Sequence, residues 1–552
     1  MPSWSDRLFA NLALAQASAT SRAFERACGN VDEAQRAALR RALRVVAGSA
    51  FARAHELTPT MSTRDFRRAA PIHTFEQMRP WVERVAAGDT SALFAAGREV
   101  LMFATSSGTT AKPKWIPVTR EFVADYRRGW RTFGLKMLLD HPKAILRHIL
   151  QSSGKHDADH TACGVPVGAI TGLLARMQSR IVKRYYVGHP SIAAIESVVD
   201  RQYALMRLAI ARDVAFAITA NPATLVQLAK AVDSNADHLI RDLHDGSLRS
   251  PTTGQPLAIS KQLILASDRA RARELESLRS RSGGLRPSDY WQMNFLACWT
   301  GASMAHYLDS VREWYGPIPI RDIGLLASEG RVTIPLDDNT PVGVLDVHSA
   351  FYEFLPADRF DDPNARTLTP GELRVGEAYT VLLTNTSGLC RYRLDDVVIV
   401  RGWRGQAPLL EFSHRAGRVS SVAGEKLTES QVVAAAMDTF NKLGLRPIEF
   451  LVAPVWCDPP AYRITVDQAV PEDFTAAFDI ALGHQNDEYE SRRKSFRLGN
   501  LTIRVVPRER LASMHIRLMA ARTSTAEQYK RPVLFTGFGD DDRALAGADG
   551  SP

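Results

Sequence analysis

Thr105-Ser-Ser-Gly-Thr-Thr-Ala-Lys-Pro-Lys-Trp-Ile-Pro-Val-Thr119 lies between an apolar run at 100–104 and a segment of helical periodicity at about 120–139. The apolar run predicts a buried strand, and the periodic segment predicts a helix. The loop between them contains five hydroxyl side chains, one glycine and two lysines. Glycine lets the backbone approach a ligand closely, while amides, hydroxyls and an ammonium group donate hydrogen bonds to phosphate oxygens. The loop therefore predicts a phosphate-binding turn between a strand and a helix.

This loop is not a Walker loop, because the string G-x-x-x-x-G-K-[ST] occurs nowhere in the chain. A solvated turn is the alternative interpretation, since serine, threonine and glycine are common in loops of every function. Other motifs along the chain are needed to decide between the two.

The composition is that of a multidomain globular protein. A length of 552 residues predicts two to four domains, and 45% hydrophobic with 23% charged residues is an ordinary globular balance. The net charge of +9 would suit nucleic acid or an anionic ligand. The arginines are spread along the whole chain without a sustained basic tract, which is more typical of a solvated surface. We therefore expect no nucleic-acid partner.

The five cysteines are far apart and form no C-x-x-C pair. This pattern predicts neither a disulfide framework nor a zinc site, and it favours a cytoplasmic location. The N-terminal apolar run 8–15 is interrupted by Asn11 and predicts an amphipathic helix rather than a signal peptide. No apolar run approaches the roughly 18 residues that a spanning helix needs, so we expect no membrane partner.

A lone carboxylate, Glu329, ends the strand-like run 318–330 in the sequence Ala327-Ser-Glu-Gly330. In open α/β sheets, ligands bind beyond the carboxyl ends of the strands. A carboxylate at that place would suit Mg²⁺ held against a triphosphate. The alternative is a solvated loop glutamate.

Two further carboxylates, Asp395 and Asp396, lie inside an apolar run within the β-rich stretch 343–400. Buried acids are costly unless they are exposed at an edge or bind a ligand. In a strand the two side chains would point to opposite faces. One of them is therefore a candidate for binding the ribose hydroxyls of a nucleotide.

The helical segment 120–139 carries an aromatic stripe and several arginines. The stripe predicts core packing, with the wall of an acid-binding pocket as the alternative. Its arginines predict either solvated side chains or partners for a substrate carboxylate. The stripe consists of Phe122, Tyr126, Trp130 and Phe133, and the arginines are Arg127, Arg128 and Arg131.

The chain divides into four parts by composition. Residues 1–412 predict a large N-terminal unit. Residues 413–429, with two glycines and several charges, predict a hinge. Residues 430–538 alternate strand and helix patterns and predict a small α+β domain. The tail 539–552 is acidic and then rich in small residues, which predicts disorder.

Taken together, these motifs resemble, in the same order, those of the auxin-responsive Gretchen Hagen family of acyl-acid amido synthetases, within the adenylate-forming superfamily. The resemblance extends from about residue 40 to 535. Three segments match the nucleotide motifs of the family: 106–110 with Lys114, 327–330, and 392–397. Two more match its hinge, 412–429, and its C-terminal motif, 528–532. Asp395 stands where the third motif normally has glycine, which leaves the local packing there in question.

The resemblance implies an α/β fold, with a large adenylation domain that includes a β-rich subdomain, a hinge and a smaller C-terminal α+β domain. It also implies ATP and Mg²⁺ as cofactors, a small carboxylic acid as substrate, and an amino acid or other amine as acceptor. Glu329 and Lys530 would be catalytic, and Glu329 would bind the metal. The nucleotide would be bound by Ser106, Ser107, Gly108, Thr109, Thr110, Lys114, Ser328, Tyr392, Asp396, Arg415 and Lys426.

The implied reaction has two steps, adenylation of the acid with release of pyrophosphate and transfer of the acyl group to the amine. One alternative is a ligase that transfers the acyl group to a thiol such as coenzyme A or a carrier protein. Another is a non-catalytic homologue that only binds nucleotide. The acid, the amine and the base that deprotonates the amine are not identified by the sequence.

Overall fold

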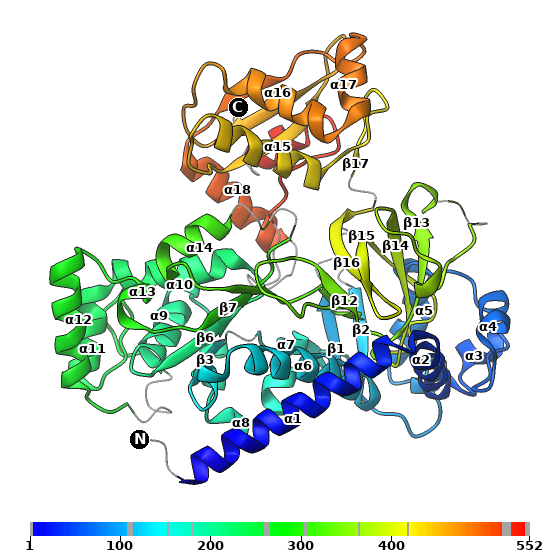
Figure 1. The fold of residues 1–552 in the computed structure, drawn as a ribbon, viewed down its shortest axis with the longest axis horizontal. Coiled ribbons are helices and arrows are strands. Elements are labelled where there is room, and N and C mark those ends of the chain that lie inside the picture. The colour runs from blue at the N-terminus through cyan, green and yellow to red at the C-terminus, as the bar shows by residue number, and fades with distance from the viewer. Residues whose placement is uncertain are drawn as a thin grey trace.

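The computed structural model describes residues 4–106, 114–151, 154–178, 180–258, 265–301, 304, 307–360, 362, 365–416, 419–521 and 531–546. These residues form a mixed α/β structure in which a large N-terminal part carries a smaller C-terminal unit (Figure 1). The α/β fold class expected from the sequence is confirmed.

An N-terminal layer of helices covers one side of the large part. Helix α1 crosses helix α6 and continues toward the β-rich region, where the shorter helices gather (Figure 1). Helix α5 begins with a capping box, in which the Gln77 side chain accepts a hydrogen bond from the Thr74 backbone amide at 2.7 Å. The helices of the layer are α1 (Trp4–Cys28), α2 (Val31–Val46), α3 (Ala50–Ala54), α4 (Thr63–Ala69) and α5 (Phe75–Ala86).

The phosphate-loop candidate closes a hairpin within a four-stranded sheet of order β2-β1-β5-β4. Ser106 at the end of β1 pairs with Lys114 at the start of β2. Helix α6 (Arg120–Asp140) begins directly after β2, and the Thr119 hydroxyl accepts a hydrogen bond from the Phe122 amide at its N-terminus. The predicted strand and helix are therefore confirmed. The strands are β1 (Val100–Ser106), β2 (Lys114–Thr119), β4 (Asp159–His160) and β5 (Pro166–Gly168).

A second sheet is parallel and has the order β3-β6-β7-β8. Because all four strands run the same way, their carboxyl ends lie along one edge. The strands are β3 (His148–Gln151), β6 (Val214–Ile218), β7 (Phe295–Cys298) and β8 (Ile320–Asp322). The helices around it are α7 (Ile170–Arg176), α8 (Arg180–Lys183), α9 (Val198–Ala209), α10 (Pro222–Ser234), α11 (Ala236–Asp245), α12 (Arg269–Ser282), α13 (Pro287–Tyr290) and α14 (Leu308–Tyr315).

A third sheet is antiparallel, with six strands in the order β11-β12-β16-β15-β14-β13. Its apolar faces share one hydrophobic core with the helical layer and with the β1 hairpin. The strands are β11 (Thr333–Ile334), β12 (Gly343–Leu345), β13 (Phe351–Pro356), β14 (Ala378–Thr384), β15 (Tyr392–Arg404) and β16 (Ala407–Arg415). A short hairpin, β9 (Leu326–Ala327) and β10 (Gly330–Arg331), precedes it.

The C-terminal unit has a hydrophobic core of its own, built around a three-stranded sheet of order β19-β20-β21. A two-stranded hairpin of β17 and β18 leads into it from the large part. Its elements are β17 (Val419–Ser420), β18 (Leu427–Thr428), α15 (Glu429–Lys442), β19 (Phe450–Val455), β20 (Ala461–Val466), α16 (Phe474–Gln485), α17 (Asp487–Lys494), β21 (Thr502–Val505), α18 (Arg508–Ala521) and α19 (Asp540–Ala546).

Helix α19 corrects the expectation that the whole tail 539–552 is disordered. Asp541 is fully buried and pairs with Arg463 and Arg504 at 2.6 and 2.7 Å, while Leu545 joins a small apolar cluster with α18. An acidic run is therefore ordered here because two arginines of the sheet pair with it. Residues 547–552 lie outside the described part of the chain.

Candidate active site

The ends of the first and second nucleotide motifs lie against each other. Ser328, in the turn between β9 and β10, donates a hydrogen bond from its hydroxyl to the Thr105 carbonyl at 2.8 Å. Thr105 lies one residue before the end of β1, where the phosphate-loop candidate begins. The loop and the Ala327-Ser-Glu-Gly turn therefore meet, although 223 residues separate the two contacting residues.

Glu329 connects the second motif to the third. The residue is only 3% exposed, and its backbone carbonyl accepts a hydrogen bond from the side-chain amide of Asn385 at 2.6 Å. Its carboxylate accepts one from the Tyr392 hydroxyl at 3.3 Å, and the Lys114 ammonium donates to the same hydroxyl at 3.5 Å. Burial, and next the Glu329 charge, hold the pKa of Tyr392 well above its usual value, so the phenol stays neutral and can donate. One hydroxyl thus joins residues of all three motifs.

Asp396 and Arg415 face each other on the paired strands β15 and β16. The Arg415 Nε lies 3.8 Å from an Asp396 carboxylate oxygen. Burial acts to lower the pKa of Arg415, but the charges of Asp396, Glu329 and Asp395 outweigh it and leave that pKa raised. Arg415 is therefore a permanent cation beside the carboxylates, as the hinge motif implied.

Asp395 has a left-handed backbone with φ of +61°. Aspartate is one of the few residues other than glycine that reach this region readily. Its carboxylate accepts a hydrogen bond from the Arg393 Nε at 2.6 Å, and its carbonyl accepts one from the Ala416 amide at 2.6 Å. Asp395 therefore adopts a conformation that glycine at the same position could also adopt.

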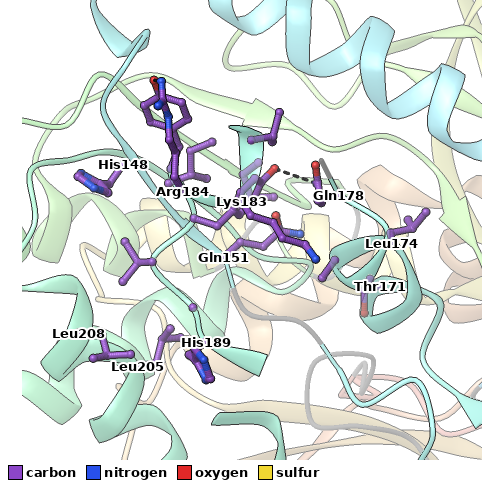
Figure 2. Close-up of a pocket in the computed structure, with 18 of the residues that line it drawn as sticks. His148, Gln151, Thr171, Leu174, Gln178, Lys183, Arg184, His189, Leu205 and Leu208 are labelled. Atoms are coloured by element: carbon purple, nitrogen blue, oxygen red, sulfur yellow. Dashed lines mark hydrogen bonds between the residues drawn. The ribbon is translucent and has the colours of Figure 1, made fainter. Parts of the chain in front are cut away.

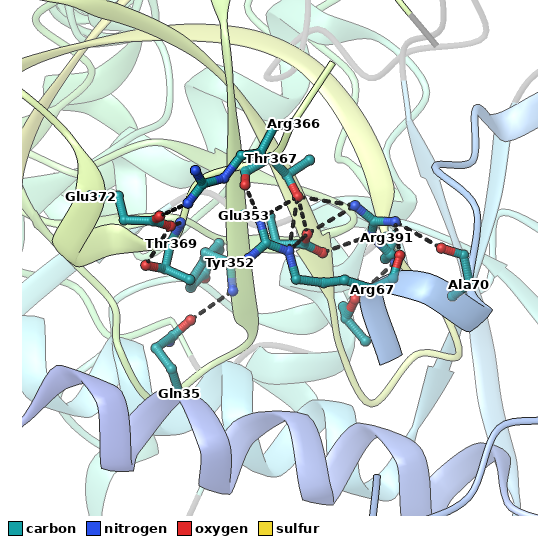
Figure 3. A network of polar contacts seen from close by, with 11 residues as sticks. Gln35, Arg67, Ala70, Tyr352, Glu353, Arg366, Thr367, Thr369, Glu372 and Arg391 are labelled. Atoms are coloured by element: carbon teal, nitrogen blue, oxygen red, sulfur yellow. Dashed lines mark hydrogen bonds and ion pairs between the residues drawn. The ribbon is translucent and has the colours of Figure 1, made fainter. Parts of the chain in front are cut away.

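A buried ionic network fixes the residue before Tyr392, as Figure 3 shows. Arg391 donates two hydrogen bonds to the Glu353 carboxylate at 2.9 and 3.0 Å, and others to the carbonyls of Arg67 and Ala70. Glu353 is 1% exposed and also pairs with Arg67 at 3.1 Å. The network therefore ties helix α4 to strands β13 and β15 directly behind the third motif.

His73 adds a second attachment to the same strand. Its backbone amide donates to the Arg391 carbonyl, and its own carbonyl accepts from the Arg393 amide, at 3.0 and 2.9 Å. The His73 Nδ1 lies 2.9 Å from the Cys390 carbonyl. Burial lowers the pKa of His73 to about 4, so the imidazole is neutral. Sequence analysis missed His73 and Arg391; the visible signal was Glu353, a lone acid inside the apolar strand 351–355.

The other expected site residues fall into three groups. Lys426 is exposed, with φ of +50°, and no contact found among the described residues joins its side chain to the cluster around Glu329. Ser106 ends β1, but its side chain is not described. The remaining ones lie outside the described residues: Ser107, Gly108, Thr109, Thr110 and Lys530. Arg531, next to Lys530, lies 5.8 Å from the ring of Tyr307 in the large part.

A cavity of about 2010 Å³ is lined by residues of α6, α7, α9 and the second sheet, and none of the described motif residues lines it. Gln151 and Ile218, at the carboxyl ends of two neighbouring parallel strands, line it together with Thr171 of α7 (Figure 2). Helix α7 follows β5, whose last residue, Gly168, accepts a hydrogen bond from the Thr105 hydroxyl at 3.4 Å. The cavity is therefore joined to the motif cluster through β5, and it is large enough for a small-molecule ligand.

The expected core packing of helix α6 is confirmed, because Phe122, Tyr126 and Phe133 are buried in the core and Trp130 packs against it. Trp130 and Phe133 also line the cavity, and an acid-binding role for them stays a prediction. All three arginines line the cavity too, but Arg128 is paired with Asp125 at 2.9 Å. In the described part of the chain, no group of three or more histidine, cysteine, aspartate or glutamate side chains could hold a metal ion. No described helix is both long and apolar enough to cross a membrane.

Comparisons with known proteins agree over most of the chain. Residues 20–320 match the GH3 family N-terminal domain, 343–415 the central domain and 430–537 the C-terminal domain. The sequence is 24% identical over 522 residues to jasmonoyl–L-amino acid synthetase JAR6 of Nicotiana attenuata, covering 88% of each chain. It is 26% identical over 582 residues to probable indole-3-acetic acid-amido synthetase GH3.12 of Oryza sativa subsp. japonica, covering 92% of each chain.

A solved structure, AtGH3.15 acyl acid amido synthetase in complex with 2,4-DB, superposes with a TM-score of 0.83 at 19% identity, covering 96% of this chain and 95% of that one. The fold is therefore that of an acyl acid amido synthetase structure, and the three sequence motifs meet within it. The chain belongs to the GH3 family, whose three domains match it in order. The resemblance found in the sequence is thereby confirmed.

Proposed function

We propose that the protein is an ATP-dependent acyl-acid amido synthetase, an amide-forming ligase that joins a carboxylic acid to the amine of an amino acid or another amine. The observation that carries this proposal is the meeting of Lys114, Ser328, Glu329 and Tyr392 at one point, with the Asp396 and Arg415 pair beside it. Relatives named as amino acid synthetases support the same reaction class.

In the first step, an oxygen of the substrate carboxylate attacks the α-phosphorus of ATP. The bond to the β-phosphate breaks, and acyl-adenylate and pyrophosphate form. Lys114 lies where β2 leaves the phosphate loop, so its ammonium can offset negative charge that develops on the phosphates. Asp396, 8% exposed beside Arg415, is placed to accept hydrogen bonds from the ribose hydroxyls.

Glu329 is the residue that would hold Mg²⁺. It is buried, and it is a single carboxylate rather than part of a described cluster. Magnesium commonly binds one or two carboxylates together with substrate phosphates and water, so this donor set fits the ion. When bound, the ion would neutralise charge on the triphosphate. The Tyr392 hydroxyl donates to Glu329 and holds its carboxylate in place.

In the second step, the amine nitrogen attacks the acyl carbonyl carbon, the carbon–oxygen bond to AMP breaks, and the amine loses a proton. We propose that residues 413–429 act as a hinge and that Lys530, of the C-terminal motif, supplies a cation to the adenylate. The position of Arg531 supports this proposal, because its guanidinium lies 5.8 Å from the ring of Tyr307 in the large part. Lys426 is proposed to reach the nucleotide only when the C-terminal unit rotates.

The acid is proposed to occupy the cavity lined by α6, α7 and α9. Its apolar wall suits a hydrocarbon or aromatic body, and its Thr171 side adjoins β5 and the end of β1. The five cysteines are unpaired thiols. This state and the use of ATP support a cytoplasmic location, and the reaction requires neither nucleic acid nor a membrane.

The test is ATP-dependent release of pyrophosphate by the purified protein, with Mg²⁺ and a panel of carboxylic acids, with and without amino acids. We expect release that depends on one class of acid, with an amide as the product when an amino acid is present. Glu329→Gln should reduce the rate at least about a hundredfold, while the control Glu313→Gln, at an exposed position of α14, should not. Release that is completed only by a thiol would replace this proposal with a thiol ligase.

A further inference from the structure

The cavity lined by α6, α7 and α9 is strongly cationic. Eleven lysine and arginine side chains line it, against two aspartates. Within the described part of the chain, only Arg128 and Arg147 among these cations form an ion pair with a carboxylate. Clefts lined by one sign of charge attract ligands of the opposite sign. The other nine cations are therefore not neutralised by a carboxylate among the described residues.

Two of these cations, Lys183 and Arg184, are held in place by other groups. The Arg184 guanidinium lies 4.9 Å from the ring of Tyr185 and 5.8 Å from the ring of Phe9, and it donates a hydrogen bond to the Tyr185 hydroxyl at 2.8 Å. The Lys183 ammonium donates to the Arg176 carbonyl at 2.9 Å. Both side chains keep unused donors, and neither is neutralised by these contacts.

The cations lie on more than one side of the cavity, because Arg176 is the last residue of α7 and the Lys183 ammonium bonds its carbonyl. Figure 2 shows Arg184 across the view from Thr171 and Leu174 of α7, with Lys183 between them. Apolar side chains, among them Leu205 and Leu208, line another part of the space. A ligand with one end near Thr171 would therefore reach Lys183 first and Arg184 beyond it, with its body against apolar wall.

We propose that the acid substrate has an apolar body and a second anionic group, and that Lys183 and Arg184 bind this second group. The inference rests on the proposed function. The carboxylate that is activated must reach the α-phosphate beside Lys114, which does not line the cavity, so it is not available to pair with Lys183 and Arg184. Arginine and lysine form charge-assisted hydrogen bonds with carboxylate, sulfonate or phosphate groups. These cations therefore match a second anion on the same molecule.

The test compares two acids that differ only in charge. One is an arylalkanoic acid that carries a sulfonate in the para position of its ring, and the other carries a neutral sulfonamide there. The sulfonate group cannot itself be adenylated. Both compounds are tested with alkanoic chains of several lengths. Binding to the full chain is measured by calorimetry without ATP, and turnover is measured by pyrophosphate release. We expect the sulfonate to bind about tenfold more tightly at its best chain length. Added salt should weaken this preference.

The variant K183Q/R184Q should bind the sulfonate about tenfold more weakly and change sulfonamide binding less than about twofold. The control K442Q/R446Q removes two exposed cations of the C-terminal unit that do not line the cavity, and it should change neither. Equal binding of the two acids, or equal weakening of both by K183Q/R184Q, would overturn the inference. Absence of pyrophosphate release with every acid, despite preferential binding of the sulfonate, would instead contradict the proposed function.

Discussion

The left-handed residue in the third motif gives a sharp test of the backbone argument. Asp395 has φ of +61° and pairs with Arg393, with side chains 29% and 19% exposed. With valine at this position, the left-handed backbone conformation would cost roughly 1–2 kcal/mol, and with aspartate it costs less. It would also lose a surface ion pair worth up to about 1 kcal/mol. Asp395→Val should therefore destabilise the large part by about 2 kcal/mol.

Glycine at the same position should behave differently. It adopts this conformation without steric cost, which offsets the lost ion pair, so Asp395→Gly should lie within about 0.5 kcal/mol of the natural protein. With an unfolding entropy of about 2.1 cal/mol/K per residue over roughly 400 residues, Asp395→Val should lower the melting temperature by about 2–3 °C. The control Asp358→Val, at an exposed position without a left-handed backbone, should lower it by less than about 1 °C.

The assay is a calorimetric melt of each variant together with its pyrophosphate release. Asp395→Val should lose activity as well, because the same strand carries Tyr392 and Asp396. Asp395→Gly should retain it. Equal destabilisation by glycine and valine would show that the aspartate side chain, rather than the backbone conformation, stabilises this turn, and would refute the reasoning.

Three further changes test the surroundings of the site. Tyr392→Phe removes the hydrogen bond to Glu329 and should lower kcat about tenfold without a change in melting temperature; a fall in both would assign the tyrosine to folding. Arg391→Gln breaks a buried ion pair with Glu353, which Arg67 also contacts, so the free energy of unfolding measured in urea should fall by about 3 kcal/mol. An unchanged urea midpoint would contradict a stabilising role for this network. The pKa of His73 is lowered to about 4 by burial, so the unfolded chain binds more protons and stability should fall as pH drops from about 6.5 toward 4. His73→Gln should make that fall shallower, and an unchanged slope would show that His73 does not contribute to it.

Local patterns were sufficient to predict the elements that flank the site. The strand that ends at Ser106 and the helix that begins after Thr119 are decided by neighbouring residues. The resemblance implied that Ser328 and the phosphate loop bind one nucleotide, but no local signal predicted the hydrogen bond between Ser328 and Thr105, because 223 residues separate them.

The remaining features depend on contacts that a single sequence does not show. Arg391 donates to the carbonyl of a residue 324 positions away, so no local pattern could connect them. The left-handed turn at Asp395 arises where the pairing register between β14 and β15 shifts. The helix at 540–546 looked disordered because the tail is acidic and then rich in small residues, yet Arg463 and Arg504 pair with Asp541 in the folded unit.

The central claim is that the acid's carboxylate becomes bonded to the α-phosphorus of ATP before an amide forms. The most direct measurement uses an acid labelled with oxygen-18 in its carboxylate, together with ATP, Mg²⁺ and an amino acid, and analyses the products by mass spectrometry. One labelled oxygen should appear in AMP, and the amide should retain the other. AMP without label, or ADP and phosphate in place of AMP and pyrophosphate, would contradict the proposed function.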